Sequence, residues 1–391
     1  MIKTARSLHE HRQPAGGVAI AAPQQRDLVE EMPRVRVTRQ RAFAFALFIV
    51  SGVAFLYFVL PQISGVDSTV HRIGKGDIWW IAIGVALEVC SFAGYVVLFR
   101  AVFTRERGRI GWRESYLITM AGLAATRLFA AAGAGGVALT AWALRRSGMR
   151  PRIVASRMVA FMALLYAIYA VAVVIDGLGL GLGVFPGGGP AAITILPAVA
   201  AAVLMAAGGA VALLPGDIER RLGSWSAGSG RGAHLIAHLV SAPALTAHGI
   251  RSAIELLRTR QPGLLGAPAW WGFDVAVLWS CFHAFGAAPP FTVILMAYFV
   301  GMLGNLLPLP GGLGGVEGGM IGAFAAFGVE FNLAVLAVLT YRGIAFWLPT
   351  VPGALAYLQL RRTVARWRAE EAGGEDEPAV GAQAAAVSIS A

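Results

Sequence analysis

A helix-breaking segment lies inside one of the most apolar regions of the chain. Residues 305–319 read NLLPLPGGLGGVEGG and contain two prolines, six glycines and one carboxylate, Glu317. Proline lacks the amide proton that a helix needs and glycine disfavours the helix interior, so this segment interrupts its helix. Non-helical backbone at membrane depth is tolerated only where protein or a watery cavity shields it. A broken helix of this kind is typical of transporters that bind their cargo near the membrane midplane.

The composition of the chain is that of a membrane protein. Of its 391 residues, 57% are hydrophobic and 14% are charged, with a mean hydropathy of +0.67. These values predict an all-α polytopic membrane protein. The net charge of +11 indicates attraction to anionic lipid rather than to nucleic acid, because the arginines lie between apolar segments. Cys90 and Cys281 lie within apolar segments and indicate neither a disulfide framework nor a metal site.

The apolar segments predict about six full transmembrane helices. They are residues 42–60, 78–103, 153–175, 191–214, 264–286 and 333–359. Two further apolar regions, 115–144 and 291–328, are too long for one span and are broken by glycines. We expect a transmembrane domain over residues 41–360, with its first helix acting as a signal anchor. The polar residues 1–40 and the low-complexity residues 361–391 are expected to be disordered cytoplasmic tails.

The distribution of basic residues predicts the orientation of the helices. Most of the 32 Lys and Arg residues fall in alternate segments, namely 1–41, 104–114, 145–157, 215–262 and 361–391. The positive-inside rule makes these segments cytoplasmic, which predicts a bacterial-type cytoplasmic membrane protein with both termini inside. Segment 215–262 has apolar residues at helical spacing. It is predicted either to lie along the inner leaflet or to pack on the helix bundle.

The two long apolar regions are predicted to be re-entrant helical hairpins. Region 115–144 has basic residues on both sides, so both of its ends are cytoplasmic, whereas region 291–328 has no basic flank and both of its ends are external. Two oppositely oriented hairpins are typical of an inverted repeat, and GAGGV at 133–137 resembles GLGGV at 312–316. The predicted hairpin tips comprise Gly133, Gly135, Gly136, Pro308, Pro310, Gly311, Gly312, Gly314 and Gly315.

Five ionisable residues lie deep in the apolar segments and form the candidate substrate-binding site together with one polar residue. These are Glu88, Arg127, Asp274, Glu317 and Arg342, with Asn305. Each charge costs roughly 2.5–3.5 kcal/mol to insert at the centre of a membrane helix. Each is therefore expected to face the protein interior and to have a partner or a function.

The chemistry of these residues leaves several roles open. The guanidinium groups of Arg127 and Arg342 could each hold a phosphate through two hydrogen bonds. Glu317 could bind a cationic head group, carry a coupling proton, or pair with Arg342 and pin the hairpin to the last helix. Glu88 and Asp274 could either join two helices by a hydrogen bond or contact cargo or a proton.

The sequence contains no motif of a known catalytic or cofactor site. The zinc-peptidase pattern HExxH, the dinucleotide pattern GxGxxG after a strand, the P-loop and the GxSxG elbow are all missing. The seven His residues are scattered, and His283 is expected to be a packing residue. We therefore expect a protein that is not an enzyme and that needs no metal or cofactor.

The sequence PLPGGLGGVEGG, followed by FGV at 327–329 and YRGIAFWLPTVPG at 341–353, resembles a known family. This is the lysylphosphatidylglycerol synthase transmembrane-domain family, also described as flippase-like or UPF0104 membrane proteins. The resemblance covers roughly residues 42–360. The family's first glycine motif corresponds to residues 131–148, where Ala132 and Ala138 replace its usual proline and acidic residue.

The resemblance implies transport of a lipid. In bifunctional relatives, a soluble transferase makes aminoacylated phosphatidylglycerol and the membrane domain moves it to the outer leaflet. Only about 30 residues follow the last predicted span, too few for such a domain, so the resemblance implies the transport half alone.

Our leading hypothesis is a flippase moving a phospholipid or lipid-linked head group by alternating access of the two hairpins. Its partners would be membrane lipids, either anionic or aminoacylated phospholipids or lipid-linked sugars. The alternative is a membrane partner that delivers lipid to a separate glycosyltransferase or aminoacyltransferase. An integral-membrane transferase with an unrecognised site is a third alternative.

Overall fold

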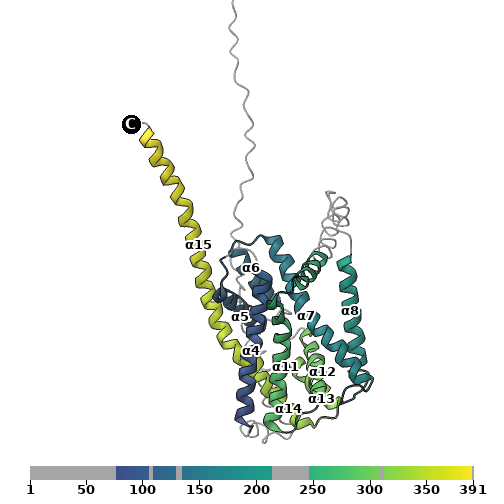
Figure 1. Ribbon diagram of the computed structural model, residues 1–391. Helices are drawn as coiled ribbons and strands as arrows, with labels where there is room; N and C mark the ends of the chain where they lie inside the picture. The colour runs from purple at the N-terminus through teal and green to yellow at the C-terminus, as the bar shows by residue number, and fades with distance from the viewer. Residues whose placement is uncertain (1–75, 105–108, 129–133, 214–245, 308–311, 390–391) are drawn as a thin grey trace, which may run out of the picture. The chain divides into compact units, whose positions relative to one another are not determined.

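The computed structural model describes residues 76–104, 109–128, 134–213, 246–307 and 312–389, with side chains to Glu370. All of these residues belong to one compact unit, residues 36–391. The regular structure of the described residues is entirely helical, as predicted (Figure 1). The predicted N-terminal tail and first span lie outside the described residues, as do Gly133, Pro308, Pro310 and Gly311.

Ten labelled α-helices form the described part of the bundle. They are α4 (Ile78–Phe103), α5 (Trp112–Leu128), α6 (Ala134–Arg146), α7 (Pro151–Gly181), α8 (Ile195–Leu213), α11 (Gly266–Phe285), α12 (Phe291–Met302), α13 (Gly315–Ala326), α14 (Phe331–Arg342) and α15 (Leu348–Ile389). Three shorter helices connect them: η3 (Pro262–Leu265), η4 (Leu303–Leu306) and the π-helix η6 (Gly343–Trp347).

Several of the predicted spans correspond to long apolar helices. Helix α4 has the predicted bounds, and α7 and α8 overlap the segments predicted at 153–175 and 191–214. These three helices and the run Phe331–Glu370 are long and apolar enough to cross a membrane. Helix α11 corresponds to the span predicted at 264–286 and, with 20 residues, is about 30 Å long. It lies at the centre of the bundle and packs along α4.

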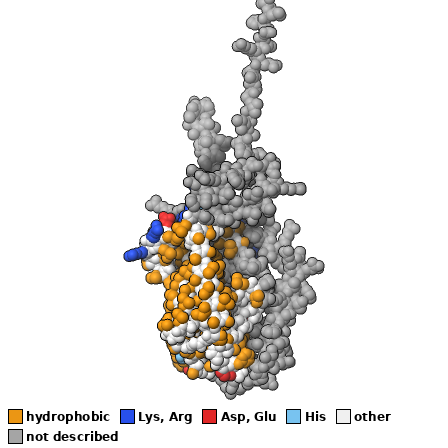
Figure 2. Space-filling model, turned by 90° about the vertical axis from the view of Figure 1, so that its right-hand side faces the viewer, with side chains coloured by type: hydrophobic (Ala, Val, Ile, Leu, Met, Phe, Trp, Pro, Cys, Tyr) orange, Lys and Arg blue, Asp and Glu red, His pale blue; other side chains and the backbone are white. Residues whose placement is uncertain are grey.

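The described helices expose apolar side chains, as expected for a surface that faces lipid. Figure 2 shows a face that is mostly apolar, with its Lys and Arg side chains at the upper edge. Helix α8 is exposed along much of its length, including Leu196, Val203 and Leu204. A soluble protein would rarely leave such a large apolar surface in water. The surface therefore supports the prediction of a membrane protein.

Two helical hairpins enter the bundle from opposite ends. Helices α5 and α6 pack together, and both open ends of this hairpin lie at the arginine-rich end, next to Arg145 and Arg146. Helices α12 and α13 also pack together, and their open ends lie at the other end of the bundle, where Thr292 donates a hydrogen bond to the Pro186 carbonyl. Helices α12 and α13 have 12 residues each, or about 18 Å, against a hydrocarbon thickness of about 30 Å. That the hairpin tips stop within the bilayer stays a prediction.

The order of helices is repeated along the chain. Helix α4, the hairpin α5–α6 and the long helix α7 are followed, after α8, by α11, the hairpin α12–α13 and the run α14–η6–α15. Each half thus places a short-helix hairpin between two longer helices, and the two hairpins open at opposite ends. This order supports the predicted inverted repeat.

Two segments outside the predicted spans differ from simple tails or loops. Helix α15 continues to Ile389, and the disorder expected for 361–391 stays a prediction. Its Ala, Glu and Arg residues are strong helix formers, and Trp367 is buried and accepts a hydrogen bond from Arg109 through its carbonyl.

Of the segment 215–262, residues 246–258 are helical and pack on α7, where Gly249 approaches Val159. The described part of that segment therefore favours packing on the bundle.

Candidate functional site

The five ionisable residues predicted from the apolar segments converge on one region of the bundle. Four are buried, with exposed fractions of 3% for Glu88, 7% for Asp274, 4% for Glu317 and 6% for Arg342. Arg127 is partly buried and lies in the electrostatic range of both Glu88 and Asp274. The residues come from α4, α5, α11, α13 and α14, so the cluster requires helices from both halves of the chain.

Asp274 is the centre of one half of this cluster. Its carboxylate accepts hydrogen bonds from the hydroxyl groups of Tyr298 on α12 and Tyr341 on α14, the latter at 3.1 Å to Oδ2. Its side chain also forms a hydrogen bond with Glu88 on α4. Two buried carboxyl groups in contact cannot both be ionised without strong repulsion, so the pair is suited to sharing one proton. The Oε2 atom of Glu88 accepts no hydrogen bond from a donor among the described residues.

Glu317 and Arg342 form the other half of the cluster. Arg342 Nε donates to Glu317 Oε1 at 2.7 Å, and Glu317 Oε2 accepts the amide of Gly314 at 2.7 Å. Glu317 is the third residue of α13 and Gly314 precedes that helix, so the carboxylate caps the helix N-terminus as well as pairing with α14. This geometry favours the reading in which the pair pins the hairpin to the last long helix.

Arg127 binds backbone carbonyls rather than a carboxylate. Its Nη2 donates to the Ala345 carbonyl at 2.9 Å and its Nη1 to the Phe346 carbonyl at 2.8 Å, both within the π-helix η6. Pro349 explains one of these bonds, because a proline has no amide proton to donate to the carbonyl four residues earlier, at Ala345. Arg127 thus supplies a donor that the helix lacks.

The remaining predicted residues have other surroundings. Asn305 is exposed on η4 and donates to the Met302 carbonyl, so it is not part of the cluster. His283 packs against the rings of Trp80 and Trp279, which confirms its expected packing role. As described above, Arg127 and Arg342 already use donors within the protein. A phosphate bound by either would have to share or replace those bonds.

The predicted hairpin-tip glycines that the structure describes have two different roles. Gly312 and Gly314 have φ angles of +65° and +81°, a left-handed region that favours glycine, and they form the turn before α13. Gly315 begins α13. Gly135 and Gly136 instead lie in the first turn of α6. A side chain at Gly136 would collide with the carbonyl of Gly122 on α5, which explains the need for glycine there.

An apolar groove leads to the carboxylate pair. It lies between α4, α5 and α15 and has a volume of about 500 Å³. Its lining consists of apolar side chains together with Glu88, and includes Val85, Val97, Tyr116, Met120 and Pro352. Glu88, whose Oε2 is buried without a hydrogen-bond partner among the described residues, is therefore one of the residues that line a groove of otherwise apolar side chains. Such a groove is suited to an acyl chain or another long apolar group.

Comparison with known proteins identifies the family. The family described as lysylphosphatidylglycerol synthase TM region matches residues 42–353, which include all the cluster residues and both hairpins. The chain belongs to this family. It is thus an integral membrane protein of a family with a lipid-related function, as the motifs of residues 308–353 indicated.

Curated relatives of the lysylphosphatidylglycerol synthase TM-region family match shorter stretches of the chain. A UPF0104 membrane protein of Methanothermobacter thermautotrophicus is 36% identical over 109 residues, which are 28% of this chain and 31% of the relative. A second from that organism is 36% identical over 86 residues, or 22% and 26% of the two chains. A UPF0104 membrane protein of Pyrococcus horikoshii is 31% identical over 93 residues, or 24% and 28%. The matched stretches span about a third or less of these relatives.

Three residues of this family member were missed by the sequence reasoning. Tyr298 and Tyr341 lie in apolar helices, and a buried tyrosine usually needs a partner for its hydroxyl group, which is the signal that could have found them. Asp176 lies near the end of α7, just beyond the predicted span. It is buried with both carboxyl oxygens unpartnered among the described residues. The sequence reasoning missed Asp176 because it lies at the boundary of a predicted span.

Proposed function

We propose that this protein is a lipid flippase, a transporter rather than an enzyme, that moves a phospholipid between the two leaflets. The observation that carries the proposal is that Glu88, which has a buried carboxyl oxygen without a partner among the described residues, is part of the lining of the apolar groove. A buried polar oxygen without a structural partner is expected to have a functional one. The family membership supports a lipid as the cargo.

The groove and the carboxylate pair would have separate roles in transport. An acyl chain would occupy the apolar groove, while Glu88 and Asp274 would receive a proton or a cationic part of the head group. The cluster contains three carboxyl groups and two guanidinium groups, so its formal charge is −1 when all five are ionised. One proton or one monovalent cation neutralises this charge, so the buried cluster would favour binding of a coupling ion.

The π-helix η6 would be the moving joint in this proposal. Arg127 on hairpin α5–α6 binds the backbone of η6. Glu317 on hairpin α12–α13 binds Arg342, the residue just before η6. A π-helical turn has weaker regular hydrogen bonding than an α-helix and is often found at functional sites. Alternating release of the two hairpins from η6 would open the cluster first to one leaflet and then to the other.

The proposal is tested by lipid flipping in proteoliposomes. Fluorescent phosphatidylglycerol is placed in both leaflets, and the fraction that an external quencher reaches is followed with time. Glu88→Gln should slow flipping by roughly tenfold or more, since a lost charge contact in a buried site is worth about 1.4 kcal/mol or more. Glu370→Gln, an equal change on the exposed part of α15, should flip like the unaltered protein.

Stability measurements separate function from folding in this test. Glu88→Gln removes one of two repelling carboxylates, so its melting temperature should equal or exceed that of the unaltered protein. Full flipping by Glu88→Gln would remove the carboxylate from the mechanism. No flipping by the unaltered protein, combined with retained lipid after purification, would favour the alternative in which the protein delivers lipid to a separate transferase.

A further inference from the structure

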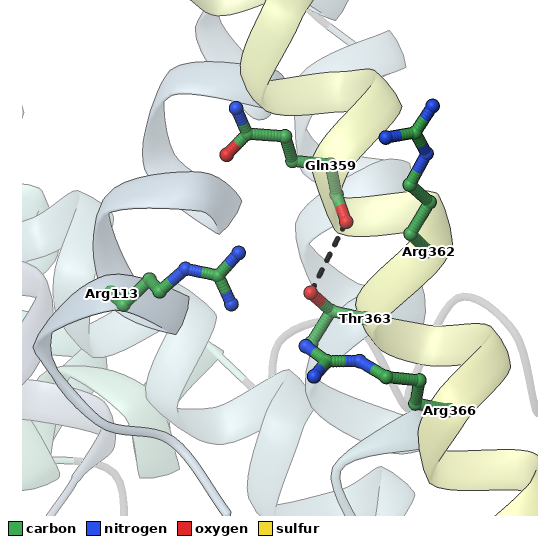
Figure 3. A pocket seen from close by; sticks show the side chains of 5 residues that line it. All are labelled: Arg113, Gln359, Arg362, Thr363 and Arg366. Carbon is green, nitrogen blue, oxygen red and sulfur yellow. Dashed lines mark hydrogen bonds between the residues drawn. The ribbon is translucent and has the colours of Figure 1, made fainter.

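A basic pocket lies between α5 and α15, away from the carboxylate cluster. Its lining residues are Arg113 on α5 and Gln359, Arg362, Thr363 and Arg366 on α15, and its volume is about 470 Å³. Figure 3 shows Arg113 reaching from α5 toward α15, with Arg366 extending back toward α5. Three arginine residues thus line one space that is open to the exterior of the protein.

The three arginines do not use their charge within the described part of the chain. No hydrogen bond or ion pair joins Arg113, Arg362 or Arg366 to another described side chain or carbonyl. The nearest carboxylate in sequence to Arg113, Glu114, accepts the amide of Gly111 at 2.9 Å. Thr363, which also lines the pocket, is buried and donates to the Gln359 carbonyl one turn earlier on α15, at 3.1 Å. As far as the described residues go, these guanidinium groups are available for an anion.

The same two helices form both the basic pocket and the apolar groove. On α5, Trp112 lines the groove and the next residue, Arg113, lines the pocket. On α15, Pro352 and Gln359 line the groove and the pocket respectively, and are separated by about 10 Å of helix. The basic pocket and the apolar groove therefore lie about one head-group length apart along the seam between α5 and α15. This arrangement matches the charged head group and the apolar acyl chain of a phospholipid.

The dimensions of the groove fit one leaflet of a bilayer. Its lining on α4 runs from Val85 to Val97, which is about 18 Å of helix. Half of a hydrocarbon core of about 30 Å is about 15 Å, the depth reached by one acyl chain. The basic pocket lies toward the arginine-rich end of the bundle, where the phosphates of the adjoining leaflet would be.

We propose that this α5–α15 seam binds one anionic phospholipid from the leaflet at the arginine-rich end. Its phosphate lies among Arg113, Arg362 and Arg366, and one acyl chain lies in the groove below. Arginine suits this task because its planar group donates two parallel hydrogen bonds to a phosphate. The inference rests on the proposed flippase function only for its role as the loading site. The binding itself is independent of transport.

The test is equilibrium binding of a short-chain phosphatidylglycerol to the full chain in zwitterionic nanodiscs. Arg362→Gln combined with Arg366→Gln should weaken binding by roughly thirty-fold, whereas phosphatidylcholine binding should change little. Arg361→Gln combined with Arg368→Gln is the matched control. These two arginines are exposed on the same helix and outside the pocket, so an equal loss of charge should weaken binding by less than about threefold.

Each other result has a defined meaning. Equal losses in the two double variants would reduce the effect to general charge attraction and overturn the proposal. Displacement of the lipid by inorganic phosphate at equal concentration would make the pocket a site for free anions instead. Arginine-dependent binding in a protein that does not flip lipid would leave this inference standing while removing the proposed function. Lipid flipping by a protein whose lipid binding does not depend on these arginines would overturn this inference and leave the proposed function standing.

Discussion

The two helical hairpins contact the region of the π-helix η6 through different kinds of interaction. The hairpin α5–α6 contacts the π-helix η6 through one guanidinium group, that of Arg127, bound to two backbone carbonyls. The hairpin α12–α13 contacts the residue just before η6 through the buried pair of Glu317 and Arg342. Both guanidinium groups lie near the Phe346 ring, at 5.1 Å from its centroid for Arg127 and 4.3 Å for Arg342.

The difference indicates which hairpin is held more firmly. Breaking a buried ion pair by removing one partner costs about 3–5 kcal/mol, whereas removing the donor from a neutral carbonyl costs about 1–3 kcal/mol. Close backbone approach joins the two helices within each hairpin, at Gly136 and Gly122 in α5–α6 and at Gly304 and Gly315 in α12–α13, so it does not distinguish the two hairpins. We therefore expect α5–α6 to be the hairpin that moves more readily.

The largest expected effect comes from breaking the ion pair. Arg342→Met leaves the Glu317 carboxylate buried without its partner and should lower the free energy of unfolding by about 4 kcal/mol. Thermal unfolding in detergent measures the change. The double variant Glu317→Gln with Arg342→Met keeps an oxygen for the Gly314 amide and removes both charges. It should recover more than half of the loss, and a double variant as unstable as Arg342→Met would contradict the ion-pair explanation.

The backbone contact of the second hairpin gives the next effect. A methyl group at Gly304 would lie 2.3 Å from the Gly315 carbonyl carbon, so Gly304→Ala should separate η4 from α13 and cost about 3 kcal/mol. Gly318→Ala is the control, since no atom lies within 4 Å of its added methyl group. In the interior of α13 the control should be neutral or stabilising by up to about 1 kcal/mol. Equal melting temperatures for both variants would argue against close packing at Gly304.

The first hairpin should respond more weakly at its contact. Arg127→Met leaves the Ala345 carbonyl without its side-chain donor, while the Phe346 carbonyl keeps the hydroxyl of Thr350, and should cost about 2 kcal/mol. Hydrogen–deuterium exchange should rise in α5 and α6 and stay unchanged in α13. A loss of protection in α12–α13 of the same size would show that the two hairpins are not held independently.

The smallest effect is expected where the second hairpin meets the carboxylate pair. Tyr298→Phe removes the hydroxyl group that binds Asp274, while Tyr341 continues to donate to that carboxylate. The free energy of unfolding should fall by about 1 kcal/mol, the net value of one buried hydrogen bond. A double-mutant cycle with Tyr341→Phe measures whether the two bonds are coupled. Additive losses would mean that each tyrosine acts alone.

The charged cluster was largely accessible from the sequence, although its connections were not. An ionisable side chain in an apolar segment is costly, and that cost was enough to select Glu88, Asp274 and Glu317 as residues with a partner or a function. The partners could not be assigned, because Arg127 and the Phe346 carbonyl are 219 positions apart. Asn305 was selected as a polar residue within an apolar segment, but polarity alone does not determine which way a side chain faces.

The sequence by itself determined the class of protein, the bounds of α4 and the presence of two hairpins with opposite entry. These features follow from local constraints, since membrane thickness fixes helix length and basic flanks predict the side of entry. Tertiary structure alone decided that Arg127 binds carbonyls, that Glu317 pairs with Arg342, and that α5 and α15 form a groove with a basic pocket. Those features depend on how each helix is rotated against distant neighbours, which packing contacts set and local sequence does not.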